Sequence, residues 1–454
     1  MTIQVSPSPI ANSDAMSLRS AVLDRDEYLT GLLNQLTAQK AEGWLQELRQ
    51  HAVKWVRHST IPTTREEEWR FTDLSALRKV QFQAATQFIP SEISSLTLPE
   101  AANSRLVFVN GVYTPDLSAI TDLPAGVIVS NLTALPQAEQ EHISQYLAQA
   151  EGAEEVFTAL NTAGLTDVAV VVVRKNVVIE TPIHLLFIAV GGDKPTISQP
   201  RCLVVAESGS QVTFIEEYTN HKDTEGKVYL TNAVTEIWLA ENAQVSHTRV
   251  EREGAEAFHI GKTAIAQARD SRYTCNAITF GGKLSRHNLE VLQTGEQTET
   301  TLNGLTIIYG NQLADTHSAI ALNHPYGKSE QLHKCIVGDR AHAVFNGKVF
   351  VPKPAQLTNA AQLNRNLLLS SKARVDTKPQ LEITADNVKC AHGATVSQLE
   401  DDEIFYLQSR GIDENAARNL LINAFAAEII NQIPVASLRE TLLTTVNSLK
   451  SSHD

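Results

Sequence analysis

The sequence predicts a mainly β protein in which a β-helix core lies between two helical ends. Hydrophobic periodicity changes twice along the 454 residues, from a helical pattern to short strands and back to a helical pattern. The strand-rich part also carries a degenerate repeat, which is typical of stacked coils. We therefore divide the chain into a mostly helical region at 1–159, a β-helix at 160–397 and a helical domain at 398–454.

The first region opens with a leader, containing Pro7 and Pro9, that we expect to be disordered. Leucines at 29, 32, 33 and 36 then have the i, i+3, i+4, i+7 spacing of one helix face. A second helix, with tryptophans at 44 and 55, is expected to stop before Pro62. Further along we expect strands at Leu106–Val109 and Val127–Val129 and a polar helix near Glu139–Glu151.

The repeat of the second region is clearest in Leu239–Val245, which runs apolar, small, acidic, any, small, polar, apolar. Related copies are Val205–Val212 (with one inserted residue), Gln267–Tyr273, Thr294–Thr300, Val337–Ala343 and Leu369–Val375. A small residue at one fixed place suits the tight corner of a coil, and stacking supplies the core that one coil lacks. These small residues are Ala243, Ser271, Thr298, Ala341 and Ala373. A β-sandwich is the alternative, because short strands joined by turns also build sandwiches.

Helical periodicity returns in the third region. Asp413 suits the N-cap of a helix with Glu414 in its first turn, and Pro434 ends that helix. Its apolar stripe consists of Ile422, Phe425, Ile429 and Ile433. A last helix is expected at Ala436–Leu449. Two amphipathic helices after a solenoid can cap its end or dock a partner, and the pattern alone slightly favours capping.

Composition limits the partners and the location. The formal charge is −13, which argues against nucleic acid or an anionic membrane as the main partner. We find neither an apolar run long enough for a membrane span nor a secretory signal. The four cysteines lie far apart without a CxxC pair, which predicts free thiols in a reducing compartment, by default the cytoplasm.

Catalytic motifs are missing from the sequence. Two Gly-Lys-Ser/Thr strings, at 261–263 and 327–329, lack the earlier glycine of a phosphate-binding loop and have Glu256 and Leu322 in its place. GxSxG, HExxH and a well-placed GxGxxG are also absent. We therefore expect no enzyme activity and no tightly bound cofactor, with any ATP hydrolysis supplied by a partner.

The remaining chemical signal is thiol and imidazole. Cys390 and His392 are two residues apart, so on a strand they project from the same face and could meet one soft metal or cluster. Two ligands cannot complete a tetrahedral site, and a lone strand cysteine is more often an inert core residue. His333 and Cys335 repeat the spacing in reverse order. Structural or solvent-facing roles are expected for His317, His324 and His342.

The stretch Pro379–Val396, followed by Ile404–Ile412, resembles the C-terminal signature of the SufD family, subunits of the SufBCD iron–sulfur assembly complex. Shorter matches occur at 65–72, 109–113, 159–163 and 345–349. SufD fits better than its sister SufB because Gly393-Ala394-Thr395 follows the histidine and Ala424 precedes Phe425. Asn387, Ala391 and Ser397 differ from the residues that are commonest in the family at these positions, which puts in doubt a role for the side chains at 387 and 391.

The resemblance implies a non-catalytic scaffold with a right-handed parallel β-helix that pairs with SufB and docks the ATPase SufC. The resemblance implies that SufC docks on the C-terminal helices, and we expect Ile422, Phe425 and Ile429 to take part. This expectation replaces end-capping. Cys390 and His392 match family positions near the SufB interface that are implicated in building the nascent cluster. We therefore expect a transient iron–sulfur cluster or iron there.

Two other functions stay open from the sequence. One is a β-helix enzyme acting on polysaccharides, which would line a groove with Asp, Arg or Lys. The other is a purely structural homodimer without a cluster role. The sequence leaves open whether the isolated chain pairs with itself through the coils that would otherwise meet SufB.

Overall fold

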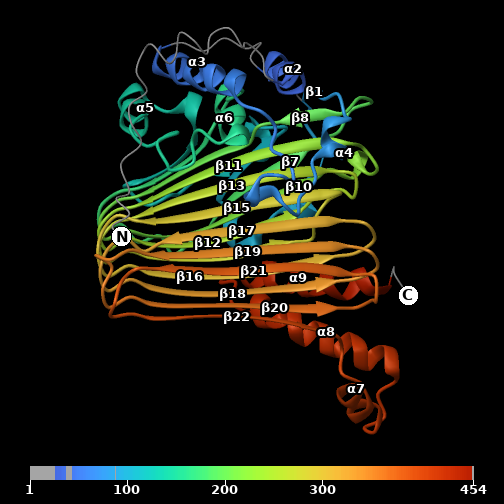
Figure 1. Cartoon of the computed structure of the whole chain (residues 1–454). Helices are drawn as coiled ribbons and strands as arrows, with labels where there is room; N and C mark the ends of the chain where they lie inside the picture. The colour runs from blue at the N-terminus through green and yellow to red at the C-terminus, as the bar shows by residue number, and fades with distance from the viewer. Residues whose placement is uncertain (1–25, 37–42, 87, 91, 452–454) are drawn as a thin grey trace.

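The computed structural model describes residues 26–36, 43–86, 88–90 and 92–451, and the leader expected to be disordered lies outside them. The described chain forms a mainly β structure whose core is a β-helix of about 8 turns, with helices at both ends (Figure 1). The predicted fold class is confirmed. Among the described helices, none is both long enough and apolar enough to cross a bilayer.

Successive strands of the core alternate between two sheets. Sheet A contains β5 (Val127–Asn131), β6 (Ala169–Val173), β9 (Arg201–Ala206), β11 (Tyr229–Leu239), β13 (Phe258–Gln267), β15 (Leu284–Gln293), β17 (Leu313–Ala321), β19 (His342–Val351) and β21 (Arg374–Ile383), with β1 (Gln83–Ala84) and β8 (Thr196–Ser198) beside them. Sheet B contains β2 (Ser104–Val109), β3 (Val112–Tyr113), β4 (Ala119–Ile120), β7 (Ile183–Ala189), β10 (Gln211–Asn220), β12 (Gln244–Arg252), β14 (Arg272–Thr279), β16 (Glu299–Ile308), β18 (Lys328–Val337), β20 (Asn359–Leu368) and β22 (Lys389–Ser397).

Each core strand pairs in parallel with the strand one coil earlier and the strand one coil later. In sheet A, Ile265 lies beside Ile237 on one side and Val291 on the other, and all three are buried. Like residues therefore stack in columns, and the inner columns of the two sheets pack into one apolar cluster. Parallel pairing along the core excludes the sandwich alternative, which requires antiparallel sheets.

The corners of the coils explain the sequence repeat. Ala243, Ser271 and Thr298 are fully buried at successive corners between sheet A and sheet B, where the backbone N–H of Arg272 donates to Ala243 O. The residue before each of them has a positive φ, 56° at Asn242 and 58° at Asp270. Such corners need a residue that tolerates the left-handed region, followed by a small one.

The alignment of the repeat was wrong in one respect. Ala341 and Ala373 belong to the opposite corner, between sheet B and sheet A, where the N–H of Arg374 donates to Ala341 O. Both corners of a coil select small residues for the same steric reason. The sequence pattern therefore merged two columns into one, which accounts for the long interval between Thr298 and Ala341.

Helices α2 (Glu27–Leu36), α3 (Gly43–His58), α5 (Gln137–Ile143) and α6 (Val156–Ala163) gather near the first coils (Figure 1). The four predicted leucines of α2 are all buried, and α3 ends before Pro62 as predicted. Helix α5 is shorter than the predicted polar helix. The Glu236 carboxylate accepts hydrogen bonds from the backbone N–H groups of Ala148 (2.9 Å) and Ala150 (3.2 Å), which are therefore not used in a longer helix.

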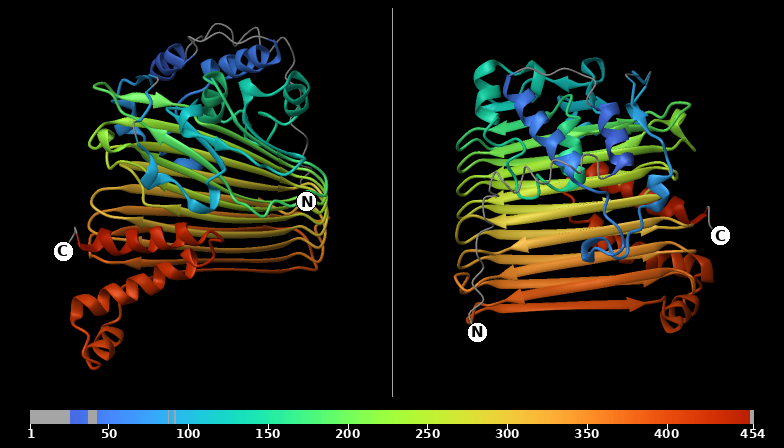
Figure 2. Two further views of the ribbon diagram at one scale, coloured as in Figure 1. Left: turned by 180° about the vertical axis from the view of Figure 1, so that it is seen from behind. Right: turned by 45° about the horizontal axis from the view of Figure 1, so that its top comes forward.

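The C-terminal helices are α7 (Asp401–Gln408), α8 (Glu414–Ile430) and α9 (Ala436–Ser451). The predicted N-cap is confirmed, since Asp413 Oδ1 accepts from the N–H of Ala416 at 3.0 Å. Helix α8 packs across β16 and β18, with α9 beside it, while α7 projects past the last coil (Figure 2). End-capping, which the pattern alone favoured, is therefore wrong, because the helices cover a sheet face and leave the end of the β-helix open.

The interior also holds charged and polar groups. His247 Nε2 lies 3.0 Å from Glu216 Oε2, and both side chains are buried. Burial opposes the charge, yet Cys275 and Glu216 raise the pKa of His247 to about 9. By contrast, burial lowers the pKa of His333 to about 4, so different interior histidines favour different protonation states.

Candidate functional site

Cys390 and His392 lie on β22, the last strand of sheet B, which among the described strands pairs with β20 alone. Cys390 is opposite Ala360 and His392 is opposite Gln362, and both of those partners are buried in the coil above. The register therefore places thiol and imidazole in inward-facing columns. Because no described coil follows, Cys390 is half-buried and His392 is exposed.

Cys390 and His392 do not form a complete ligand set among the residues that the structure describes. Cys390 packs against the interior apolar cluster, and burial raises the pKa of its thiol. In the described residues, three or more His, Cys, Asp or Glu ligand atoms converge at one place only, and that place does not include Cys390 or His392. A metal held here would need ligands from outside the described residues.

Two family models match the chain. The family model described as "SUF system FeS cluster assembly, SufBD core domain" matches residues 187–425, and that of the "SufBD protein N-terminal region" matches 30–185. The chain belongs to the SufBD family. Its residues from β7 to α8 form the SufBD core, so the last coil and the helix on sheet B are parts of one matched domain.

Relatives that match most of the chain include proteins named SufD and proteins named for the SufBD family. An iron–sulfur cluster assembly SufBD family protein of Synechocystis is 49% identical, over 96% of this chain and 98% of that protein. The chloroplastic protein ABCI7 of Arabidopsis thaliana is 37% identical over 89% of this chain and 86% of its own length. The iron–sulfur cluster assembly protein SufD of Escherichia coli is 33% identical, over 88% and 92%.

The other histidine–cysteine pair lies deep in this SufBD core. His333 Nε2 is 3.1 Å from Thr306 Oγ1, and its ring stacks on Phe345. Burial raises the pKa of Cys335 to about 12, so its thiol is protonated and a poor ligand. The pair fits an interior packing role.

Two of the remaining histidines have carboxylate partners. His317 lies between Asp315 Oδ1 (3.0 Å) and Glu68 Oε2 (3.2 Å), and His342 Nε2 lies 2.7 Å from Asp376. These contacts tie neighbouring segments together. The backbone N–H of His324 donates to Gln293 Oε1, and a role for the His324 side chain stays a prediction.

The residues expected to dock a partner face sheet B instead of solvent. Ile422 and Ile429 are buried against the sheet, and the Phe425 ring is 3.9 Å from Lys334 Nζ. Their docking role stays a prediction, and it would require α8 to leave the sheet. Exposed apolar side chains that the sequence stripe did not single out are Phe405 (70%), Tyr406 (57%) and Leu420 (49%).

A groove of about 1090 Å³ lies on the outer face of sheet A, between residues 55–69 and 149–158. Lys262 Nζ in its floor is 2.8 Å from Glu155 Oε1 and 2.5 Å from Glu290 Oε2. The Lys262 ammonium group thus joins a carboxylate of the N-terminal region to one of sheet A, and further carboxylates, Glu151 and Glu382 among them, line the same groove.

Proposed function

We propose that this chain is a non-catalytic, SufD-like scaffold subunit of an iron–sulfur assembly complex. In this proposal the last coil pairs with a SufB-like chain, and the C-terminal helical segment docks a SufC-like ATPase. Cys390 and His392 contribute to a nascent cluster or iron site where the two β-helices meet. The observation that carries the proposal is an uncovered last coil whose inward columns end in a thiol and an imidazole.

The open end supports pairing with a second β-helix. No residue of β21 or β22 is buried, although both strands of the preceding coil, β19 and β20, contain buried residues. An edge strand presents N–H and C=O groups that another strand can pair with. Strand β21 carries Pro379, which has no N–H to donate, whereas β22 contains no proline. We therefore assign the pairing edge to β22.

The ligand chemistry fits iron or a growing cluster. Thiolate and imidazole are both ligands of iron and of iron–sulfur clusters. The raised pKa of Cys390 means that metal binding must displace the thiol proton. A SufB-like partner would supply the missing ligands and exclude water from the seam.

ATP-driven motion would come from the partner, because the sequence has no phosphate-binding loop. Phe405 and Tyr406 on α7 are the exposed anchors that we assign to the ATPase. Movement of α7 and α8 relative to sheet B could then reshape the seam. A cytoplasmic location remains a prediction, and one relative is named as chloroplastic.

Co-expression with SufB-like and SufC-like chains tests the site. We expect His392→Ala and Cys390→Ala to leave the complex assembled and to lower its anaerobic iron and sulfide content at least tenfold. The matched control is Thr395→Ala, on the same strand but in an outward column. Normal cluster content in His392→Ala would remove that residue from the mechanism.

A second experiment tests docking. Phe405→Ala with Tyr406→Ala should weaken capture of the ATPase at least tenfold and leave capture of the SufB-like chain unchanged. The matched control is Gln408→Ala, at another exposed position of α7. Equal capture of the ATPase by all three proteins would contradict the assignment.

A further inference from the structure

The groove on the outer face of sheet A leaves part of that sheet uncovered. Its volume of about 1090 Å³ exceeds the roughly 300–1,000 Å³ of clefts that hold small molecules, so it has room for a short peptide segment. Alanines and one aromatic ring from successive strands line it, namely Ala264, Ala266, Ala319, Ala321 and Phe350. Small side chains let an extended chain lie close to the sheet, and Phe350 is 37% exposed.

The lysine side chains that line this groove are already paired with carboxylates. Lys262 contacts two glutamates, and Lys348 Nζ lies 2.8 Å from Glu382 Oε1. Glu151 and Glu154 line the same groove, are exposed, and form no ion pair within the part of the chain that the structure describes. The groove therefore holds negative charge that a cationic ligand would balance.

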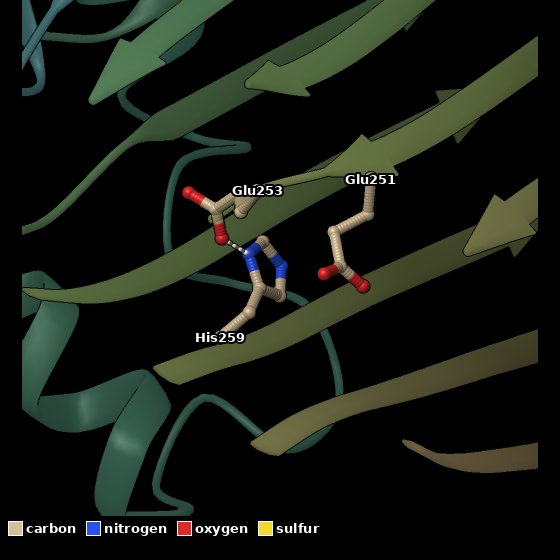
Figure 3. A group of neighbouring side chains, drawn as sticks. All are labelled: Glu251, Glu253 and His259. Carbon is tan, nitrogen blue, oxygen red and sulfur yellow. Dashed lines mark hydrogen bonds and ion pairs between the residues drawn. The ribbon is translucent and has the colours of Figure 1, made fainter. Parts of the chain in front are cut away.

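One cluster of charged groups inside the β-helix has a cation of its own, in contrast to the groove. Glu251, Glu253 and His259 meet there (Figure 3). His259 Nδ1 is 2.7 Å from Glu253 Oε2, and Arg249 Nη2 contacts the other ring nitrogen. Both ring nitrogens are thus engaged, and the Arg249 guanidinium supplies the positive charge. The exposed carboxylates of the groove lack such a partner in the described chain.

The groove already holds one guanidinium group, which belongs to this chain. The Arg286 guanidinium carbon lies 3.8 Å from the centre of the Trp69 ring, and Arg286 Nη1 lies 2.6 Å from Asp315 Oδ2. Stacking on an indole face and pairing with a carboxylate are both characteristic of arginine, whose guanidinium is planar and carries several donors. Arg286 therefore shows which chemistry this groove accepts.

Trp55 and Glu154 present the same two groups without a cation. Trp55 is 40% exposed, and its Nε1–H donates to Glu154 O, which holds the indole ring beside Glu154. No lysine or arginine side chain of the described residues lies over the Trp55 ring. Glu151 precedes Glu154 on the same segment. An arginine side chain from another molecule could therefore stack on Trp55 and pair with these carboxylates.

Another tryptophan points to a peptide instead of a polyamine. Trp238 also lines the groove, and its buried Nε1–H has no hydrogen-bond partner among the described residues. Leaving a buried donor unsatisfied is costly, so a ligand that supplies an acceptor there is favoured. Peptide carbonyl groups are acceptors, whereas a protonated polyamine offers only donors.

We propose that this groove binds an arginine-bearing peptide segment of a partner protein. An arginine side chain of that segment stacks on Trp55 and pairs with Glu151 and Glu154. The peptide backbone lies over the alanines and offers a carbonyl oxygen to Trp238. The groove is on sheet A, whereas α8 covers sheet B and the thiol–imidazole pair lies on β22 of sheet B. Binding in the groove is therefore independent of the proposed cluster site.

The test uses the full-length chain and a labelled peptide of alternating alanine and arginine, with binding followed by fluorescence anisotropy. We expect a matched peptide with citrulline in place of arginine, which lacks the charge, to bind at least tenfold more weakly. Trp55→Ala and the double variant Glu151→Gln/Glu154→Gln should each lower the affinity for the arginine peptide at least tenfold. The matched control is Glu330→Gln, which removes an exposed carboxylate on sheet B and should leave binding unchanged.

Folding of each variant is checked by circular dichroism. If Trp55→Ala fails to fold, the double glutamate variant, whose substituted side chains are both exposed, decides the question. Absence of binding, equal binding of the arginine and citrulline peptides, or unchanged binding in the folded variants overturns the proposal. Spermine that binds as tightly as the arginine peptide would identify a polyamine site and would overturn the assignment to a peptide.

Discussion

The two ends of the β-helix are built differently. At the first coils, β2 pairs with β7 and also carries the antiparallel strands β3 and β4, while β5 closes sheet A beside β6. Every residue of β6 and β7 is buried. At the last coil, no residue of β21 or β22 is buried. The same coil geometry thus gives a closed core at the first coils, which further strands and helices cover, and an open edge at the last coil.

This difference between the two ends shows that the burial of an inward-facing side chain depends on the place of its coil in the stack. In the middle of the stack, an inward side chain has neighbours above and below in its column as well as across the core. In the last coil it lacks one neighbour, so its packing energy falls and its chemistry is accessible. His333 and His392 illustrate this, since both face inward but one is buried and the other exposed.

The largest expected effect is on the pH dependence of the free energy of unfolding, compared between variants at His333 and His392. The folded pKa of His333 is about 4, below the ordinary 6.5, so the unfolded chain takes up its proton first. Its contribution to stability is therefore lost as pH falls from 6.5 towards 4, by about 3 kcal/mol. His333→Gln should remove this dependence, measured as the difference from wild type in urea unfolding at each pH.

The difference between wild type and His333→Gln isolates His333, because other buried groups also titrate and some of them do so with the opposite sign. Burial raises the pKa of Glu253 to about 8, so its contribution is lost as pH rises. His392→Gln is the control from the open end and should leave the pH profile of stability unchanged. A profile altered equally by both substitutions would show that the two positions do not differ.

A smaller effect on stability is expected when one valine from each end of the β-helix is replaced by alanine. Val171 on β6 is fully buried, whereas the Val396 residue on β22 is 52% exposed. Val171→Ala removes buried methyl groups and leaves a cavity, which should cost about 2 kcal/mol. Val396→Ala should cost less than about 0.5 kcal/mol. Denaturant midpoints at pH 7 check both values, and equal costs would mean that the last coil is covered in the isolated chain, as in a homodimer.

The smallest effect concerns the sheet face under α8. Lys334 Nζ donates to Phe425 O at 2.8 Å and pairs with Glu428, so Lys334→Met should cost about 1 kcal/mol. Lys328 is on the same strand but is exposed, and its ion pair with Glu299 is long, at 3.4 Å. Lys328→Met should therefore change stability by less than about 0.5 kcal/mol.

Proteolysis of the C-terminal helices provides a second measurement for this pair. Lys334→Met should speed cleavage after residue 398 because α8 is held less firmly on sheet B, and Lys328→Met should not. Unchanged cleavage in both variants would mean that the apolar contacts of α8 alone hold it.

Short-range features were predictable because they depend on neighbouring residues. The leucine face of α2, the N-cap at Asp413 and the small residues at the corners all follow from local spacing and local sterics. The placement of Cys390 and His392 on one strand face was predictable for the same reason. The end of α5 was not, because it depends on Glu236, a residue from a distant strand.

The sequence by itself determined that short strands and small corner residues would build coils, and that a thiol and an imidazole would share the face of one strand. Tertiary structure alone decided which corner each repeat belongs to, that α8 buries its stripe on sheet B, and that His259 meets Glu251 and Glu253. The physical reason is register. Residues on successive strands or successive coils become neighbours only when the chain closes and stacks its coils, and the end of the stack decides which inward side chains meet solvent.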